Sequence, residues 1–256
     1  MADKAVSLRG EKNVMFTNRQ LVALMWPLLL EQMLAITVGL ADSLMVATVG
    51  DAAISAVSLV DSISNLMIYV FSAMATGGAA VAGQYIGQKH KEDACNAGQQ
   101  LIALLAAVSL FFVALLYLFR PQILTTMFGH IEPDVMAATN TYYIYVMASI
   151  PGIALYNGGA ALFRTMGHSD VSLKVSLLMN SINVIGNAVL IFGFGMDVAG
   201  VAIPTLVSRT VAAVVILSLL FNRDLMLHLS DIRGFHLNMR LMKNIFYIGV
   251  PSGVEN

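Results

Sequence analysis

Residues 26–46 read WPLLLEQMLAITVGLADSLMV, and this stretch decides how the rest of the sequence is interpreted. It lies within an apolar run from Gln20 to Ala47, longer than the roughly 20 residues that a helix needs to cross a hydrocarbon core. A secretory signal peptide would have a shorter apolar core and a small-residue cleavage site. The run also holds Pro27, Glu31 and Asp42. We therefore interpret it as a retained membrane helix with polar groups in its interior.

Five similar apolar stretches follow, separated by polar segments such as the loop 120–134; they span residues 54–86, 94–119, 135–163, 171–194 and 198–221. Hydrophobic residues make up 58% of the chain and charged residues 11%, whereas soluble domains carry about a quarter charged residues. Apolar sequence resumes at Leu241 and is still running at Asn256. The sequence thus predicts an all-α membrane protein, a six-transmembrane-helix bundle plus the start of a seventh helix.

The lysines and arginines alternate between the two sides of this predicted bundle. With the N-terminus in the cytoplasm, 12 of the 14 basic residues fall on that side: Lys4, Arg9, Lys12, Arg19, Lys89, Lys91, Arg164, Lys174, Arg223, Arg233, Arg240 and Lys243. Arg120 falls on the opposite side, and Arg209 lies within the sixth stretch. Because cytoplasmic loops are enriched in basic residues, we expect a multi-pass protein of the plasma membrane with a cytoplasmic N-terminus.

The start of the first helix recurs at the end of the chain. Arg19-Gln20, Pro27 and Glu31-Gln32 correspond to Lys243-Asn244, Pro251 and Glu255-Asn256, and every pair is separated by 224 residues. Repeated halves are typical of secondary transporters, and six intervening helices would make this repeat parallel. We expect a cytoplasmic tail (1–18), a six-helix lobe (19–222), a cytoplasmic linker (223–240) and the truncated first helix of a second lobe (241–256).

Two acids of the first helix suggest a function, because ionisable groups inside a membrane are costly. Glu31 and Asp42 are eleven residues apart, so they share one helical face at a separation of about 16 Å along the axis. Both follow Pro27, which removes a backbone hydrogen bond and can bend the helix so that one half moves. The residues alone equally allow a static bend and a neutral, hydrogen-bonded Glu31.

A polar stripe lies on the fifth predicted helix. Its residues recur at spacings of four, three and four, which places them on one face: Ser176, Asn180, Asn183 and Asn187. Asparagine oxygens ligate sodium or accept hydrogen bonds from a carboxyl group, but polar residues in lipid also serve simply to join helices. The stripe holds no acid, so a cation site there needs a carboxylate from elsewhere. Asp42 is the first candidate.

Other classes of function have no signature in the chain. The zinc-protease, Walker, dinucleotide and serine-hydrolase motifs are absent, so we expect no enzyme. No basic run or zinc spacing suggests nucleic-acid binding. Cys95 is the single cysteine, which excludes a disulfide framework. Without a nucleotide site, any transport must be driven by an ion gradient or a partner protein.

Several segments together resemble the MATE (multidrug and toxic compound extrusion) exporters. In chain order they are residues 26–46, Ala82–Gly87 with the basic turn Lys89–Lys91, Arg164–Asp170, Asn183–Asn187 and Gly200–Thr205. The resemblance covers essentially the whole chain. It implies twelve helices in two six-helix lobes around a cleft that faces each side in turn. It also implies export of small cationic or amphipathic drugs from a bacterium across its inner membrane, in exchange for H⁺ or Na⁺ and with no other cofactor.

The resemblance also implies site residues. Asp42 matches a first-helix aspartate used for cation coupling, Asn183 and Asn187 match a polar pair that joins it, and Thr205 matches a sixth-helix hydroxyl. In a sodium-coupled protein, Asp42, Asn183 and Asn187 would hold Na⁺. Some relatives carry aspartate in place of Asn187, so the site here has one fewer charge.

Four further residues are implied or suggested with less specific motifs. Pro27 matches a proline about which the first helix bends, and Glu255 matches a seventh-helix glutamate. Glu31 and Asn180 are additional candidates for the cleft.

We therefore expect the N-terminal lobe of a cation-coupled multidrug exporter, embedded in the lipid bilayer and dependent on a C-terminal lobe. Two alternatives stay open. One is a flippase of the same superfamily for lipid-linked oligosaccharides or peptidoglycan precursors, which should have a larger basic cavity. The other is a non-transporting membrane subunit or receptor.

Overall fold

The computed structural model describes residues 18–129 and 132–229 of the chain. Six helices in these ranges are long and apolar enough to cross a membrane: α1 (Asn18–Val49), α2 (Asp51–Gly87), α3 (Lys91–Leu118), α5 (Pro133–Thr165), α6 (Ser169–Ala188) and α7 (Ala199–Leu220). No strand occurs in the described part of the chain. The predicted six-helix, all-α bundle is confirmed. Residues 1–17 of the predicted tail (1–18), the helix from residue 241 and Glu255 lie outside the described residues.

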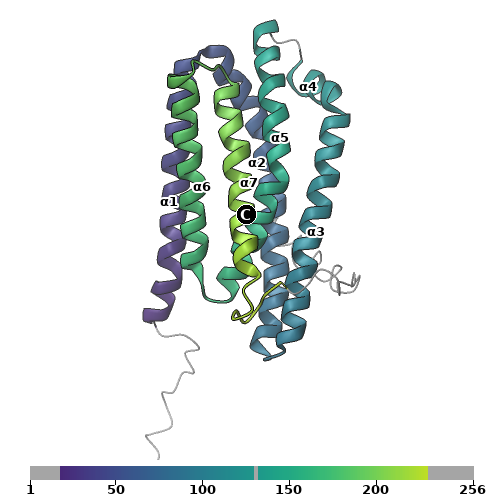
Figure 1. Cartoon of the computed structure of the whole chain (residues 1–256). Coiled ribbons are helices and arrows are strands. Elements are labelled where there is room, and N and C mark those ends of the chain that lie inside the picture. Colours follow the sequence, from purple (N-terminus) through teal and green to yellow (C-terminus); the bar gives the residue numbers. More distant parts are fainter. Residues whose placement is uncertain (1–17, 130–131, 230–256) are drawn as a thin grey trace, which may run out of the picture.

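One segment differs from the prediction. Residues 120–134, expected to form a loop, contain the short helix α4 (Arg120–Phe128), which lies at the end of the bundle between α3 and α5 (Figure 1). Pro121 occupies its first turn, where the missing N–H costs nothing and the fixed φ suits a helix. Nine residues are too few for an apolar period to emerge from the sequence, which explains why this helix was not predicted.

The spanning helices run alternately up and down, so the loops divide between two ends. The turns after α2 and α5 lie at the end where α1 begins, whereas α4 lies at the opposite end (Figure 1). The basic residues Lys89, Lys91 and Arg164 therefore belong to one end and Arg120 to the other. This is the alternation on which the predicted orientation depends.

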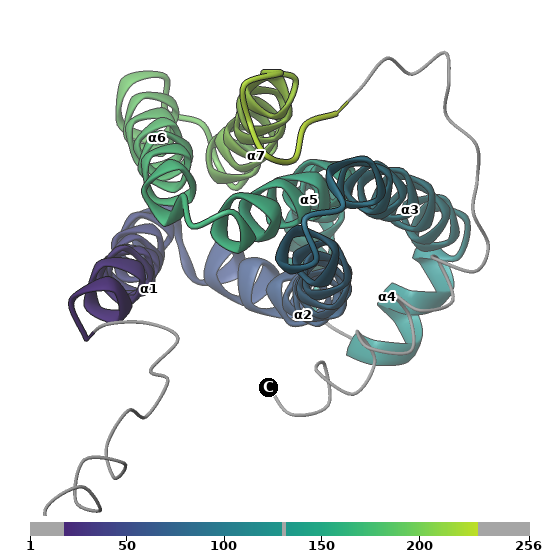
Figure 2. The ribbon, with the colours of Figure 1, turned by 90° about the horizontal axis from the view of Figure 1, so that it is seen from below.

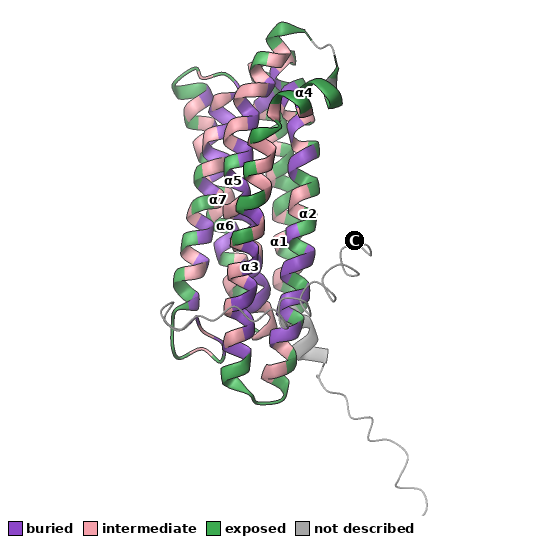
Figure 3. Cartoon of the chain, turned by 90° about the vertical axis from the view of Figure 1, so that its right-hand side faces the viewer, coloured by how far each residue is buried: buried purple, intermediate pink, exposed green. Residues whose placement is uncertain are grey.

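α5 occupies the centre of the bundle, with α2, α3, α6 and α7 packed around it (Figure 2). In its most apolar window 72% of the residues are buried, against 11% for α1, which packs mainly on α6. Exposed positions lie on the outer faces of the helices (Figure 3), and they include large apolar side chains such as Leu40, Leu44 and Phe111. An apolar outer surface is what a hydrocarbon environment requires.

α6 and α7 approach each other closely at Gly186. A Cβ atom added there would lie 2.7 Å from Pro204 Cβ, well inside contact distance. Glycine therefore lets the two helices close together, as small residues do in membrane bundles. Asn183 and Asn187 flank this glycine and Thr205 follows the proline, so the contact sets how far apart these three polar side chains lie.

The close approach makes Gly186 sensitive to a single methyl group. We expect Gly186→Ala to destabilise the protein by about 1–3 kcal/mol through overpacking, a fall in Tm of roughly 2–10 °C in detergent. Gly39→Ala in α1 is the matched control, because nothing lies within 4 Å of its added Cβ. It should leave Tm unchanged or raise it by at most about 4 °C. Equal effects of the two substitutions would contradict the role of the Gly186 contact.

Candidate cation site

Asp42 of α1 meets the amide side chains of α6. Asn187 Nδ2 donates to Asp42 Oδ1 at 2.8 Å and to Asn183 Oδ1 at 3.5 Å. Asn187 is completely buried and Asn183 nearly so, whereas Asp42 is partly buried. The structure thus brings together the acid and the two amides that the sequence analysis had paired across 141 and 145 positions of the chain. Their use in cation coupling stays a prediction.

Thr205 of α7 completes this group through Asn183. In one orientation of the Asn183 amide, Nδ2 donates to Thr205 Oγ1 at 3.1 Å and Oδ1 faces the Asp42 carboxylate. In the other orientation, Nδ2 donates to Asp42 Oδ2 at 2.9 Å and to Oδ1 at 3.1 Å, and Asn183 Oδ1 accepts from Thr205 Oγ1 at 3.1 Å. The second orientation suits an ionised carboxylate. The first sets oxygen against oxygen, so it suits a carboxyl group that carries a proton or shares a cation.

The chemistry of the donor set fits a proton or a small hard cation. Asn187 Oδ1 is buried and has no hydrogen-bond partner among the described residues, so an amide oxygen is available beside the carboxylate. Together with the Asp42 carboxylate and Asn183 Oδ1, it supplies the oxygen ligands that hard cations prefer. The described part of the chain holds no cluster of three or more His, Cys, Asp or Glu side chains that would suit a transition metal.

The backbone of α6 changes immediately after this group. Residues Val189–Gly193 form a π-helical turn (η1) that begins two positions beyond Asn187. Such turns are rare, and they are frequent at functional sites. The turn ends the polar stripe and leads into the short connection to α7.

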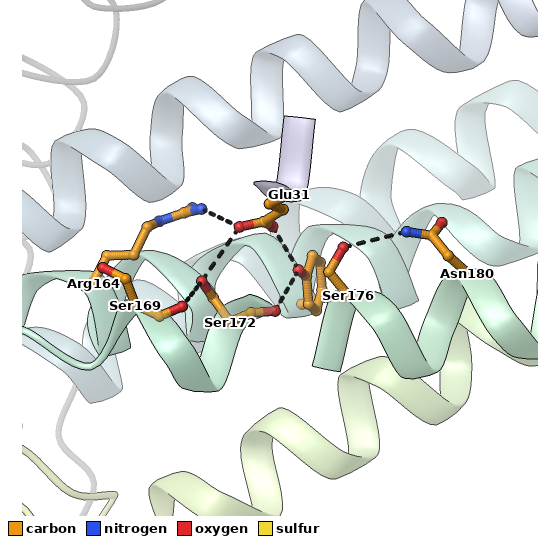
Figure 4. Close-up of polar contacts among 7 residues, drawn as sticks. Glu31, Arg164, Ser169, Ser172, Ser176 and Asn180 are labelled. Carbon is orange, nitrogen blue, oxygen red and sulfur yellow. Dashed lines mark hydrogen bonds and ion pairs between the residues drawn. The ribbon is translucent and has the colours of Figure 1, made fainter. Parts of the chain in front are cut away.

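Glu31 lies in a second polar cluster, nearer the end where α1 begins (Figure 4). Its Oε1 accepts from the Tyr156 hydroxyl at 2.9 Å and its Oε2 accepts from Ser172 Oγ at 3.3 Å. Arg164 Nη1 lies 3.6 Å from Oε2. The carboxylate of α1 is therefore attached to α5 by Tyr156 and Arg164 and to α6 by Ser172.

Other predicted site residues do not join the Asp42 group. Asn180 donates to Ser176 Oγ at 3.3 Å, next to the Glu31 cluster, so the stripe on α6 divides between the two clusters (Figure 4). Pro27 lies inside α1, which is helical on both sides of it, and bending there stays a prediction.

The sequence analysis missed the polar partners on α5. Tyr142, Ser149 and Tyr156 recur every seven residues, so they lie on one face of this central helix at levels about 10 Å apart. Tyr142 donates to Asp61 of α2, Ser149 accepts from Arg209 of α7 and Tyr156 donates to Glu31. The seven-residue spacing was a readable signal, although it does not say which charges these side chains meet.

Comparisons with known proteins agree with the fold. The MatE family model matches residues 27–189, which include Asp42, Asn183 and Asn187. This chain belongs to the MatE family. It is 30% identical over 240 residues to the uncharacterized transporter YisQ of Bacillus subtilis, covering 92% of this chain and 52% of that protein. It is 23% identical over 250 residues to the probable multidrug resistance protein NorM of Thermotoga maritima, covering 93% and 52%.

Solved structures of MatE-type transporters share the fold. An outward-facing MATE family transporter of the MOP superfamily superposes with a TM-score of 0.85 at 22% identity, over 92% of this chain and 52% of that one. A MOP superfamily transporter from Pyrococcus furiosus gives the same values. The chain spans about half the length of the curated relatives it matches. The predicted family and the N-lobe fold are thus confirmed, as is a multi-pass membrane protein of a transporter family.

The Glu31–Arg164 contact should contribute to the stability of this MatE lobe. Its side chains are 17% and 32% exposed, whereas those of the Asp170–Lys174 pair of α6 are 55% and 74% exposed. We expect a double-mutant cycle of Glu31→Gln and Arg164→Gln, measured by thermal unfolding, to give a coupling free energy of about 1 kcal/mol. The control cycle, Asp170→Asn with Lys174→Gln, should give less than about 0.5 kcal/mol despite its shorter distance. A larger coupling free energy for the exposed Asp170–Lys174 pair would show that burial does not decide the strength of these ion pairs.

Proposed function

We propose that this chain is the N-terminal lobe of a cation-coupled exporter of small cationic or amphipathic compounds. The observation that carries the proposal is the Asp42 carboxylate, held by Asn187 at 2.8 Å where α1 meets α6. An intramembrane carboxylate is a functional site by default, because its insertion is costly. The names of relatives such as NorM, a probable multidrug resistance protein, support this class of substrate.

The Asn183 amide supplies a mechanism for sensing the ion. With Asp42 ionised, Asn183 would donate to the carboxylate and accept from Thr205; with a proton or Na⁺ at Asp42, the amide would turn and donate to Thr205 instead. Each state of the carboxyl group thus selects one hydrogen-bond pattern that joins α1, α6 and α7. Na⁺ or H⁺ would contribute the positive charge that neutralises the carboxylate. The hydrogen bonds between the Asn183 amide and the Thr205 hydroxyl would change in response.

α1 is the helix that this change would move. It is the least buried of the six spans, so fewer apolar contacts oppose its displacement than for the other helices. Ion binding at Asp42 would shift the balance between two positions of α1, and hence between binding and release of the exported compound. Pro27 provides a place for the helix to bend.

The proposal places the N-terminus in the cytoplasm of a bacterial cell, because the ends of the bundle differ strongly in basic residues. It also requires a second lobe. One bundle with Asp42 near its edge cannot enclose a substrate, and the curated relatives are about twice as long as this chain. The C-terminal lobe would form the other wall of the cleft.

The proposal predicts that Asp42→Asn in the complete gene product uncouples export. Efflux of a fluorescent cationic dye, driven by an imposed pH or sodium gradient in proteoliposomes, should fall by at least about tenfold, because the amide cannot release a proton and lacks the negative charge that attracts Na⁺. Asp51→Asn is the control, since this acid is exposed at the first turn of α2. Its efflux should stay within about twofold of the unchanged protein. Undiminished, gradient-dependent efflux by the Asp42 variant would refute the mechanism.

A further inference from the structure

Asp61 and Arg209 form a second charged group in the interior of the lobe. The Tyr142 hydroxyl donates to Asp61 Oδ1 at 3.2 Å, and Arg209 Nη1 donates to Ser149 Oγ at 2.8 Å. Tyr142 and Ser149 are both buried and share one face of α5. The acid of α2 and the base of α7 are thus each bonded to the central helix.

The position of Arg209 is fixed by its own backbone as well. A Cβ added at Gly152 would lie 3.0 Å from the carbonyl carbon and oxygen of Arg209, so α5 and α7 touch backbone to backbone there. Ser149 lies three residues before Gly152 on α5. This contact fixes the backbone of Arg209 next to α5, and the hydrogen bond to Ser149 places its guanidinium there.

Arg209 interacts with both intramembrane aspartates. It lies near enough to both Asp61 and Asp42 to interact with them electrostatically, and the two carboxylates also interact with each other. Within the described ranges it makes no ion pair of 4.0 Å or shorter. Tyr142 is the other titratable group that interacts with Arg209, and α6 contributes the neutral amides Asn183 and Asn187.

The charges of this group can be counted. The guanidinium of Arg209 stays positive in proteins. Asp61 accepts the Tyr142 hydroxyl hydrogen and interacts electrostatically with the guanidinium, and a buried carboxylate needs partners of these kinds if it is to carry its charge. The two charges offset each other, and Asp42 leaves the group with one net negative charge. Because net charge in a weakly polar interior is costly, one monovalent cation brings the group to its favoured neutral state.

We propose that Arg209 is the built-in counter-ion of Asp61, and that this pair makes the Asp42 site take one monovalent cation. The proposal rests on the proposed function, since it assumes that Asp42 binds the coupling ion. It assigns Asp61 and Arg209 a role in setting ion affinity, without direct contact with the ion. Loss of either member changes the net charge around Asp42 by one unit, in opposite directions.

The test is the ion dependence of dye efflux by the complete gene product, measured in proteoliposomes as a function of Na⁺ concentration and of pH. Asp61→Asn leaves Arg209 to repel the cation, so half-maximal efflux should need at least about tenfold more Na⁺ or H⁺. Arg209→Gln should lower that requirement by at least about tenfold. The double variant restores the single negative charge and should return to within about threefold of the unchanged protein.

Two further variants separate charge from shape. Arg209→Lys keeps the charge and Ser149→Ala removes only the hydrogen bond, so both should keep an ion dependence within about threefold of the unchanged protein. A purely structural Arg209 would show the reverse, with both variants impaired and no recovery in the double variant. If a single variant fails to reach the membrane, the double variant and Arg209→Lys decide, and a tenfold shift in either overturns the proposal.

The outcome also distinguishes this proposal from the proposed function. If Asp42→Asn leaves ion dependence unchanged, the cation site itself is wrong. If Asp42→Asn abolishes it while Asp61→Asn and Arg209→Gln both stay within about threefold, the counter-ion role alone is overturned.

Discussion

Polar groups inside a bilayer must find their partners within the protein, and the arrangement of this lobe depends on that constraint. Its four interior charged residues lie on three different helices: Glu31 and Asp42 on α1, Asp61 on α2 and Arg209 on α7. Three of the four are hydrogen-bonded to one face of α5, and the fourth, Asp42, is bonded to α6. Small residues then allow the approach that these bonds require, since α5 meets α7 at Gly152 and α6 meets α7 at Gly186.

The two aspartates have different surroundings, and this difference supports the proposal that Asp42 is the one that exchanges an ion. Asp61 has a tyrosine hydroxyl and a nearby guanidinium, so its charge is met by groups that stay with the protein. Asp42 is surrounded by Asn187 and Asn183, which have no charge and can present either nitrogen or oxygen. Amides solvate an empty carboxylate and an occupied one about equally well. A site of this kind can be filled and emptied without rebuilding its surroundings.

The sequence predicted the spans and the first site because both leave local signals. Long apolar runs gave all six spanning helices, and the regular spacing of Asn183 and Asn187 identified a polar face that needed an acid. The resemblance then paired that face with Asp42. By contrast, nothing local to Glu31 reveals Tyr156, Ser172 or Arg164, because those partners depend on how α1 packs against α5 and α6. The bond between Asp61 and Tyr142 was not predicted for the same reason, because the two residues lie on different helices. Helix α4 was not predicted, because nine residues are too few to show a helical period of apolar side chains.

The polar column on α5 has a mechanical consequence. Tyr142, Ser149 and Tyr156 fasten three neighbouring helices at three successive levels, so turning or sliding α5 would break all three attachments at once. Each of the helices bonded to α5, by contrast, would lose only its own hydrogen bond to that column if it moved away. We therefore expect α5 to stay fixed while the helices bonded to it change their positions relative to it. Of these, α1 should move most easily, since it is the least buried span and two carboxylates make its hydrogen bonds to α5 and α6.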